Sequence, residues 1–189
     1  MGKNLRVNLA TLLFLCVCFI TAFAEADELR VVQIYKQDDL LNLIKENKHL
    51  ERVLADKCQL NQDIEARARV MKIPAYQFLW GDMLAWGVCV DKKQVALGID
   101  YIQRAADQGL PEALEQLGRY YHKGKLVQQD TDKAIVYLRE AGNLGNLKAQ
   151  IRLAEIFLAG HGSPLDYEGL YRQLHHSVTG DAAQHRKIA

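Results

Sequence analysis

Residues Ala113–Gly124 decide the fold, because their pattern, Ala-Leu-Glu-Gln-Leu-Gly-Arg-Tyr-Tyr-His-Lys-Gly, recurs along the chain. It appears 37 residues earlier as Tyr76–Gly87 and 36 residues later as Ala149–Gly160. Each copy places an apolar residue, a small residue, a large apolar residue and a glycine at matching positions. Self-similarity at a fixed period of about 36 residues is typical of proteins built from stacked repeats.

A second segment in each unit repeats as well. Gly98–Gly109 aligns with Ala134–Gly145 at an offset of 36 residues, and Leu170–Ser177 is a weaker third copy. Upstream, Ile64–Lys72 forms a partial copy ahead of Pro74. Each unit therefore contains two matching segments, which predicts a repeat of two elements.

Both segments of each unit are predicted to be α-helices. Their apolar and small residues recur at spacings of three and four, which places them on one helix face, and no segment alternates with a period of two. Proline suits the first turn of a helix, glycine suits the position just after one, and aspartate suits its start. The residues expected at helix ends are Pro74, Pro111, Gly87, Gly124, Gly160, Gly109, Gly145, Asp130 with Thr131, and Asp166.

Small residues within the helices should allow neighbouring helices to approach closely, and large ones should fill the space between them. The small ones are Gly81, Gly118, Ala154, Ala105 and Ala141; the large ones are Leu84, Tyr121, Phe157, Tyr101 and Tyr137. One helix pair cannot bury its apolar face alone, whereas stacked pairs can. We therefore predict an all-α fold, an α/α superhelix (solenoid) of helix pairs with a concave face.

The predicted domain boundaries follow the repeats. The repeat region is expected over 73–189, with units at about 73–109, 110–146 and 147–181. Before it we expect an extended or loose N-terminal arm at 25–37 and a degenerate opening helix pair at 38–72, with helices over about 38–53 and 60–72.

The first 24 residues have the features of a secretory signal peptide. Lys3 and Arg6 give a positive start, Leu9–Ile20 is almost wholly apolar, and Ala22–Ala24 supplies small residues on either side of a bulky one. Cleavage is expected between Ala24 and Glu25. The alternative is a membrane anchor, but the apolar run is shorter than the roughly 20 residues that a spanning helix needs. Export would leave a chain whose formal charge falls from +1 to −1.

Export would also leave two cysteines, Cys58 and Cys89, of the four in the sequence. An even number of cysteines in an exported chain favours a disulfide. Cys58 precedes the second helix of the opening pair, and Cys89 follows Gly87 in the corresponding bend of the next pair. Equivalent bends of adjacent repeats lie side by side, so we predict a Cys58–Cys89 disulfide. The alternative is a reactive or metal-binding thiol pair, although no Cys-x-x-Cys motif is present.

No catalytic or nucleotide-binding motif is found. The chain has 24 basic and 23 acidic residues, so a basic excess for nucleic acid is absent. Two sets of carboxylates could form an acid–base pair, Asp38-Asp39 and Asp63 with Glu65. They are more simply explained as helix caps or exposed residues. Trp80, Trp86 and Tyr121 are either core residues or binding anchors, and Arg67, Arg69 and Lys72 a basic cluster on an exposed face. The histidines, His49, His122, His161, His175, His176 and His185, are expected at the surface or in loops rather than on a metal.

The repeated unit reads A-x-x-x-L-G-x-x-Y-x-x-G, followed by Lys-Ala, an aromatic residue and Ala-x-x-x-Gly. This pattern resembles the Sel1-like repeat, a relative of the tetratricopeptide repeat (TPR). Ala113–Gly145 matches it best. Departures are Tyr76 in the alanine position, Leu97-Gly98 in place of Lys-Ala, and Gln173 in the aromatic position.

Three further stretches resemble the MotX family of periplasmic proteins from sodium-driven polar flagellar motors. They are the run from Cys58 to Ala68, the run from Pro74 to Cys89, and Gly162–Glu168. The resemblance implies a periplasmic, non-enzymatic adaptor of the basal body, forming the T ring with a MotY-like protein and holding a PomB-like stator subunit. It implies no cofactor, metal, nucleic acid or small-molecule substrate. Chains of this family run past the segment resembling Asp181–Ala189, so a further C-terminal tail is expected.

Two other functions are compatible with the same repeats. The first is an exported Sel1-like adaptor that works outside the motor, for example in envelope signalling. The second is a Sel1-like hydrolase of the cysteine-rich kind. Those proteins carry a cysteine pair in each repeat, whereas this chain would keep one pair in total after export.

Overall fold

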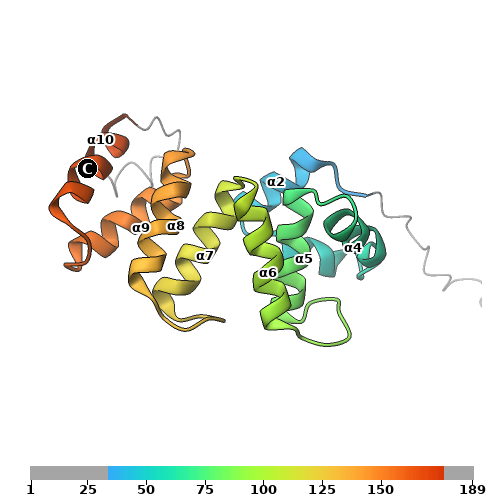
Figure 1. Ribbon diagram of the computed structural model, residues 1–189. Helices are drawn as coiled ribbons and strands as arrows, with labels where there is room; N and C mark the ends of the chain where they lie inside the picture. The colour runs from blue at the N-terminus through green and yellow to red at the C-terminus, as the bar shows by residue number, and fades with distance from the viewer. Residues whose placement is uncertain (1–33, 177–189) are drawn as a thin grey trace, which may run out of the picture. The chain divides into compact units, whose positions relative to one another are not determined.

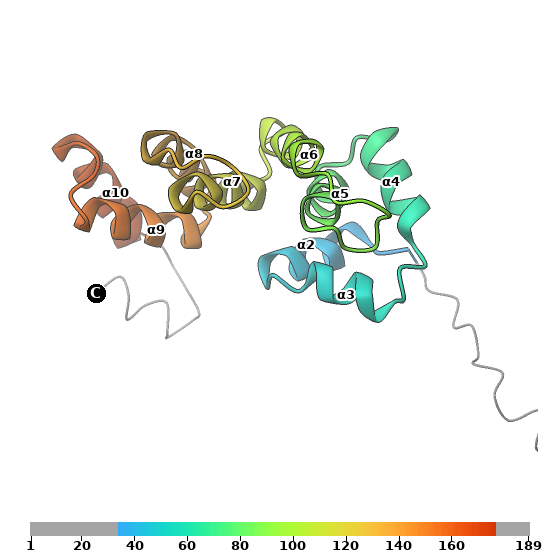
Figure 2. The ribbon, with the colours of Figure 1, turned by 90° about the horizontal axis from the view of Figure 1, so that it is seen from below.

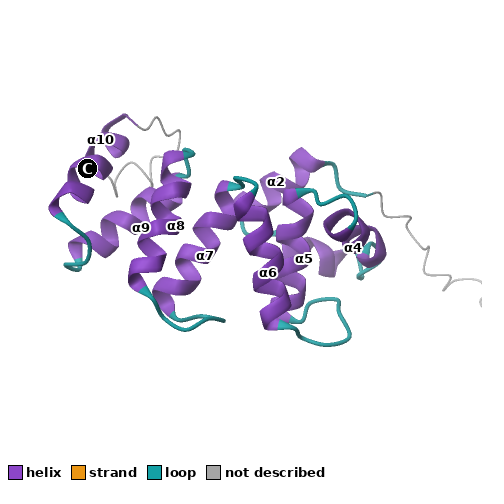
Figure 3. Ribbon diagram, viewed as in Figure 1, coloured by secondary structure: helices purple, strands orange, loops and turns teal. Residues whose placement is uncertain are grey.

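A computed structural model describes residues 34–176, and these form nine α-helices and no strand (Figures 1 and 3). The predicted signal peptide, its cleavage site at Ala24–Glu25 and most of the predicted arm lie outside the described residues. The helices, in chain order, are α2 (Gln37–Lys45), α3 (His49–Ala55), α4 (Asn61–Arg69), α5 (Pro74–Trp86), α6 (Val95–Asp107), α7 (Pro111–Lys123), α8 (Thr131–Asn143), α9 (Leu147–Leu158) and α10 (Pro164–His176).

The repeat region consists of three helix pairs, α5–α6, α7–α8 and α9–α10, and each pair packs on the next. Pro74 and Pro111 occupy the first turns of α5 and α7, and Gly87 and Gly124 end these helices with φ of 75° and 63°. A positive φ is readily adopted only by glycine. The side chain of Asp130 caps α8 by accepting a hydrogen bond from the Lys133 amide. The predicted all-α solenoid is confirmed.

Glycines inside the helices allow the close packing within the first two pairs. A Cβ atom added to Gly98 would lie 2.5 Å from the carbonyl oxygen of Gly81, and one added to Gly118 would lie 2.5 Å from the Leu138 side chain. Only a residue without a side chain fits at such a distance. Gly98 is therefore as important to the first pair as Gly81, which the sequence pattern singled out.

The opening region differs from the prediction. The single helix expected over 38–53 is two helices, α2 and α3, because Asn47 adopts a left-handed conformation with φ of 60° and ends the first. Asparagine tolerates this conformation better than most residues. The end of the predicted arm is also ordered: Tyr35 is buried, and its hydroxyl donates to Asp56 at 2.8 Å.

The short helices α2 and α3 pack on α5, and Figure 2 shows them on the side of α5 away from α6. Together with α4 and α6 they surround α5, so eleven of its thirteen residues are buried. A helix that is apolar on all sides belongs in the interior of a protein. Asp82 is the one charged residue in α5, and its side chain is only 3% exposed.

Three helices distant in sequence meet at Asp82. One carboxylate oxygen lies 2.7 Å from His49 Nε2, and the other accepts hydrogen bonds from Gln116 Nε2 at 2.6 Å and from the Tyr120 hydroxyl at 3.2 Å. Trp86 Nε1 donates to the same hydroxyl at 3.0 Å. Burial, and then the negative charge of Asp82, raise the pKa of Tyr120 and keep its phenol protonated. The network therefore links α3, α5 and α7.

Two expectations for individual side chains were wrong. His49 was expected at the surface but is 2% exposed, because α3 lies against α5. Tyr121 and Tyr137 were expected to fill the core, yet both are partly exposed. In the second repeat the fully buried position is the preceding one, Tyr120, whereas Leu84 and Phe157 at the Tyr121 position of the other repeats are buried.

A disulfide joins Cys58, just after α3, to Cys89 in the loop between α5 and α6, with a Cα–Cα distance of 5.4 Å. The Asn61 side-chain amide donates to the carbonyl oxygen of Cys89. The covalent bond thus fixes the opening helices to the first repeat at a second place, beyond the Asp82 network.

We expect Gly98→Ala to destabilise the protein, because the added methyl group would clash with backbone atoms of α5. The free energy of unfolding should fall by about 1–3 kcal/mol. The matched control is Gly169→Ala in α10, where no atom lies within 4 Å of an added Cβ. There the higher helix propensity of alanine should stabilise the protein by up to about 1 kcal/mol. Urea unfolding followed by circular dichroism measures both, and equal effects would contradict the close packing.

We expect Asp82→Asn to lower the free energy of unfolding by about 2 kcal/mol, because an amide NH2 group would face buried hydrogen-bond donors. The control is Asp100→Asn on the exposed face of α6, which removes a surface ion pair with Arg104 at 2.6 Å. It should change the free energy of unfolding by less than about 1 kcal/mol. A double-mutant cycle with His49→Gln should show coupling. Additive effects would mean that His49 and Asp82 do not act together.

Loss of the disulfide should cost about 3–4 kcal/mol, the chain-entropy value for a sequence separation of 31 residues. The Cys58→Ser/Cys89→Ser double variant should unfold at lower urea concentration than the oxidised protein. Dithiothreitol should lower the stability of the wild type to that of the variant and leave the variant unchanged. Two free thiols in protein purified from the periplasm would rule the disulfide out.

Candidate functional site

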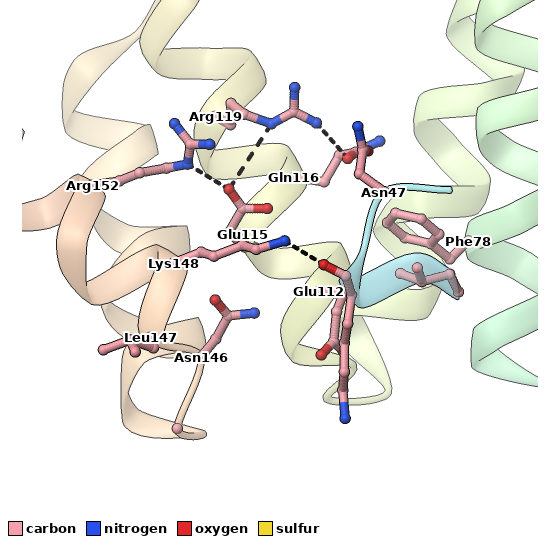
Figure 4. A pocket seen from close by; sticks show the side chains of 13 residues that line it. Asn47, Phe78, Glu112, Glu115, Gln116, Arg119, Asn146, Leu147, Lys148 and Arg152 are labelled. Atoms are coloured by element: carbon pink, nitrogen blue, oxygen red, sulfur yellow. Dashed lines mark hydrogen bonds and ion pairs between the residues drawn. The ribbon is translucent and has the colours of Figure 1, made fainter. Parts of the chain in front are cut away.

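A groove of about 490 Å³ lies where the end of α2, the helix α7 and the start of α9 come together (Figure 4). Phe78 from α5 also lines the groove. The Phe78 ring packs edge-on against His49, which belongs to the buried network at Asp82. The groove is bounded on one side by the opening helices and on the other by the third repeat. It is therefore assembled from parts of the chain that are far apart in sequence.

Six of the thirteen residues that line the groove are charged. Four of these are cations and two are carboxylates: Lys45, Arg119, Lys148 and Arg152 against Glu112 and Glu115. Glu115 is 8% exposed and already holds both arginines, with Arg152 Nε at 2.5 Å and Arg119 Nε at 3.9 Å. Glu115 is therefore already paired within the protein. With four cations against two carboxylates, the lining has a net positive charge.

Lys148 extends across the groove from α9, and its ammonium donates to the backbone carbonyl of Lys45 at the end of α2 (Figure 4). Within residues 34–176, neither lysine lies within 4 Å of a carboxylate. The first turn of α9 also faces the groove, and Asn146 caps it by accepting from the Ala149 amide at 3.0 Å. The amino-terminal end of a helix carries a partial positive charge, which adds to that of the lysines.

Two of the three aromatic residues singled out from the sequence are partly exposed near the loops. The Trp86 ring has the Lys125 ammonium 4.5 Å and the Lys93 ammonium 5.7 Å from its centroid. Tyr121 stacks on Tyr137 with centroids 5.7 Å apart. Lysines cover these rings by cation–π contacts. Trp80 is buried, so it is a core residue.

The ring of Tyr121 is also covered by a lysine. The Lys133 ammonium lies 4.2 Å from the ring centroid and donates to the Tyr121 hydroxyl at 2.8 Å. This hydrogen bond raises the pKa of Lys133, and burial raises that of Tyr137. The tyrosine stack is therefore an internally satisfied surface cluster.

The other residues considered for chemistry are not brought together. Asp38 and Asp39 are exposed in the first turn of α2, and Asp63 lies in the first turn of α4. Glu65 pairs with Arg69 at 3.5 Å, while Arg67 lies over the Tyr76 ring at 5.3 Å.

The histidines whose side chains are described, His49, His122 and His161, belong to no group of three or more potential metal ligands. Burial lowers the pKa of His122, and neighbouring cations, first Lys123, lower it further. His185 and the side chains of His175 and His176 lie outside what the structure describes. Among the described residues, no group of three or more His, Cys, Asp or Glu side chains could hold a metal ion. No described helix is both long and apolar enough to cross a membrane.

Sequence reasoning did not identify the groove. Its charges lie at a spacing of four on the first helices of two repeats, Glu115 with Arg119 on α7 and Lys148 with Arg152 on α9. That spacing places each pair on one helix face and was a usable signal. The position of Lys45 opposite them could not be read from the repeats, because it depends on how α2 packs.

Comparison with known proteins agrees with the geometry. The Sel1 repeat family matches residues 74–110, 111–146 and 147–168. The crystal structure of a Sel1 repeat protein from Oxalobacter formigenes superposes with a TM-score of 0.61 at 22% identity, covering 74% of this chain and 58% of that one. This likeness concerns the fold alone.

The sodium-type polar flagellar protein MotX of Vibrio parahaemolyticus is 55% identical over 186 residues. The match covers 98% of this chain and 88% of the relative. Identity of this extent includes the opening helices as well as the repeats, so the chain belongs to the MotX family of Sel1-repeat proteins.

Proposed function

We propose that the protein is a structural adaptor of the sodium-driven polar flagellar motor. In this role it is exported to the periplasm, joins a MotY-like protein in the T ring of the basal body, and helps to hold a PomB-like stator subunit beside the rotor. The observation that carries the proposal is the 55% identity, over nearly the whole chain, to a sodium-type polar flagellar protein.

The structure supports a role in binding rather than in chemistry. Stacked helix pairs give a rigid surface, and the disulfide and the Asp82 network hold the opening helices firmly against it. A motor that transmits torque needs adaptors that keep their shape under load. The described polar side chains are arranged as ion pairs, caps and a buried network, which suits a non-enzymatic function.

Deletion of the gene should abolish swimming, whether filaments remain numerous or become scarce. Basal bodies purified from the deletion strain should lose outer-ring density and stator occupancy, because the adaptor that retains the stator would be missing. Electron microscopy of the basal bodies and swimming in soft agar are the measurements. The wild-type gene supplied in trans should restore both.

Normal swimming with an intact outer ring would contradict a role in the motor. Co-purification with envelope proteins other than motor components would then favour an exported adaptor outside the motor. Turnover of a hydrolase substrate by the pure protein would favour the enzymatic alternative.

A further inference from the structure

We propose that the groove between α2, α7 and α9 binds an acidic polypeptide segment of a partner protein. The inference adds a binding site to the proposed function. It rests on that function for one point, namely that the partner is a motor protein. It concerns the chemistry of the contact: carboxylates of the partner pair with Lys45 and Lys148, and its backbone lies along the start of α9.

Charge complementarity favours this occupant. Lys45 and Lys148 line the groove from α2 and α9, and the α7 wall carries two carboxylates, Glu112 and Glu115, of which Glu115 already pairs with Arg119 and Arg152. With four cations against two carboxylates, the lining keeps an excess of positive charge. An anionic ligand offsets this excess, and a cationic one increases it.

The ammonium of Lys148 is held in position for such a ligand. It donates to the carbonyl oxygen of Lys45, which is an uncharged acceptor. A carboxylate is a stronger acceptor for an ammonium than a carbonyl group, so a ligand can take over this contact. The amino-terminal end of α9 lies beside it and favours the same sign of charge.

The size and composition of the groove suit a chain segment better than a small molecule. Its volume of about 490 Å³ lies in the range of ligand pockets, but nine of its thirteen lining residues are polar or charged. Small-molecule sites are predominantly apolar. Phe78 and Leu147 provide limited apolar surface for one side chain of the segment.

The test compares two double charge reversals. Lys45→Glu/Lys148→Glu changes the groove. The control, called the loop variant, is Lys92→Glu/Lys123→Glu, which makes the same change of charge on two exposed residues that do not line the groove, one in the loop after α5 and one at the end of α7, next to the following loop. Binding of the purified full chain to the purified MotY-like protein and to the periplasmic part of the PomB-like subunit is measured by biolayer interferometry at several NaCl concentrations. Thermal unfolding of each variant shows that it is folded.

The groove variant should bind at least about tenfold more weakly and depend less on salt, while the loop variant should stay within about twofold of the wild type. If the wild type binds a motor partner and both variants bind equally well, the groove inference is wrong and the proposed function stands. If the wild type binds neither partner, the proposed partners are wrong, and a second measurement tests the groove by itself.

That measurement uses a photo-reactive p-benzoylphenylalanine in place of Leu147, which lines the groove. Cross-linking in living cells followed by mass spectrometry identifies the captured segment. The proposal expects a segment with net negative charge, and the cross-link should disappear in the Lys45→Glu/Lys148→Glu background. Capture of a neutral or basic segment, capture of cell-wall glycan, or absence of any cross-link would overturn it.

Discussion

The burial of Asp82 in an otherwise uncharged helix is the constraint on which the rest of the structure depends. A carboxylate removed from water is tolerated only when several donors satisfy it. His49 comes from the opening region, and Gln116 and Tyr120 come from the second repeat. Satisfying one side chain therefore fixes the positions of three parts of the chain, which an apolar residue at the same place would not do.

The position of the opening helices decides where a partner can bind. Because α2 and α3 pack on α5, they cover that helix, and the accessible groove begins only at the end of α2. The Cys58–Cys89 disulfide then prevents the opening region from separating completely from the first repeat. The groove is consequently a property of the whole assembly, since α7 and α9 alone would supply only one wall.

The sequence predicted the features that depend on local chemistry or on the repeat. Pro74, Gly87 and Asp130 mark helix ends by their own backbone preferences, and Cys58 and Cys89 lie in corresponding bends of adjacent helix pairs, which stack side by side. The split between α2 and α3 was missed because it depends on a single turn at Asn47. The network at Asp82 was missed although a lone charge in an apolar helix signals a buried, paired carboxylate. Its partners could not be named, because they lie 33 and 34 residues away along the chain.

The contact between Lys148 and the Lys45 carbonyl has a particular consequence for the third repeat. It joins residues 103 positions apart and links α9 to the opening helices directly across the groove. An acidic segment that binds Lys148 competes with this link, whereas the cysteines of the Cys58–Cys89 disulfide do not line the groove. In the proposed complex, carboxylates of the segment pair with both Lys45 and Lys148, so the partner would itself take over the link between α2 and α9 while the disulfide still joins the opening region to the first repeat.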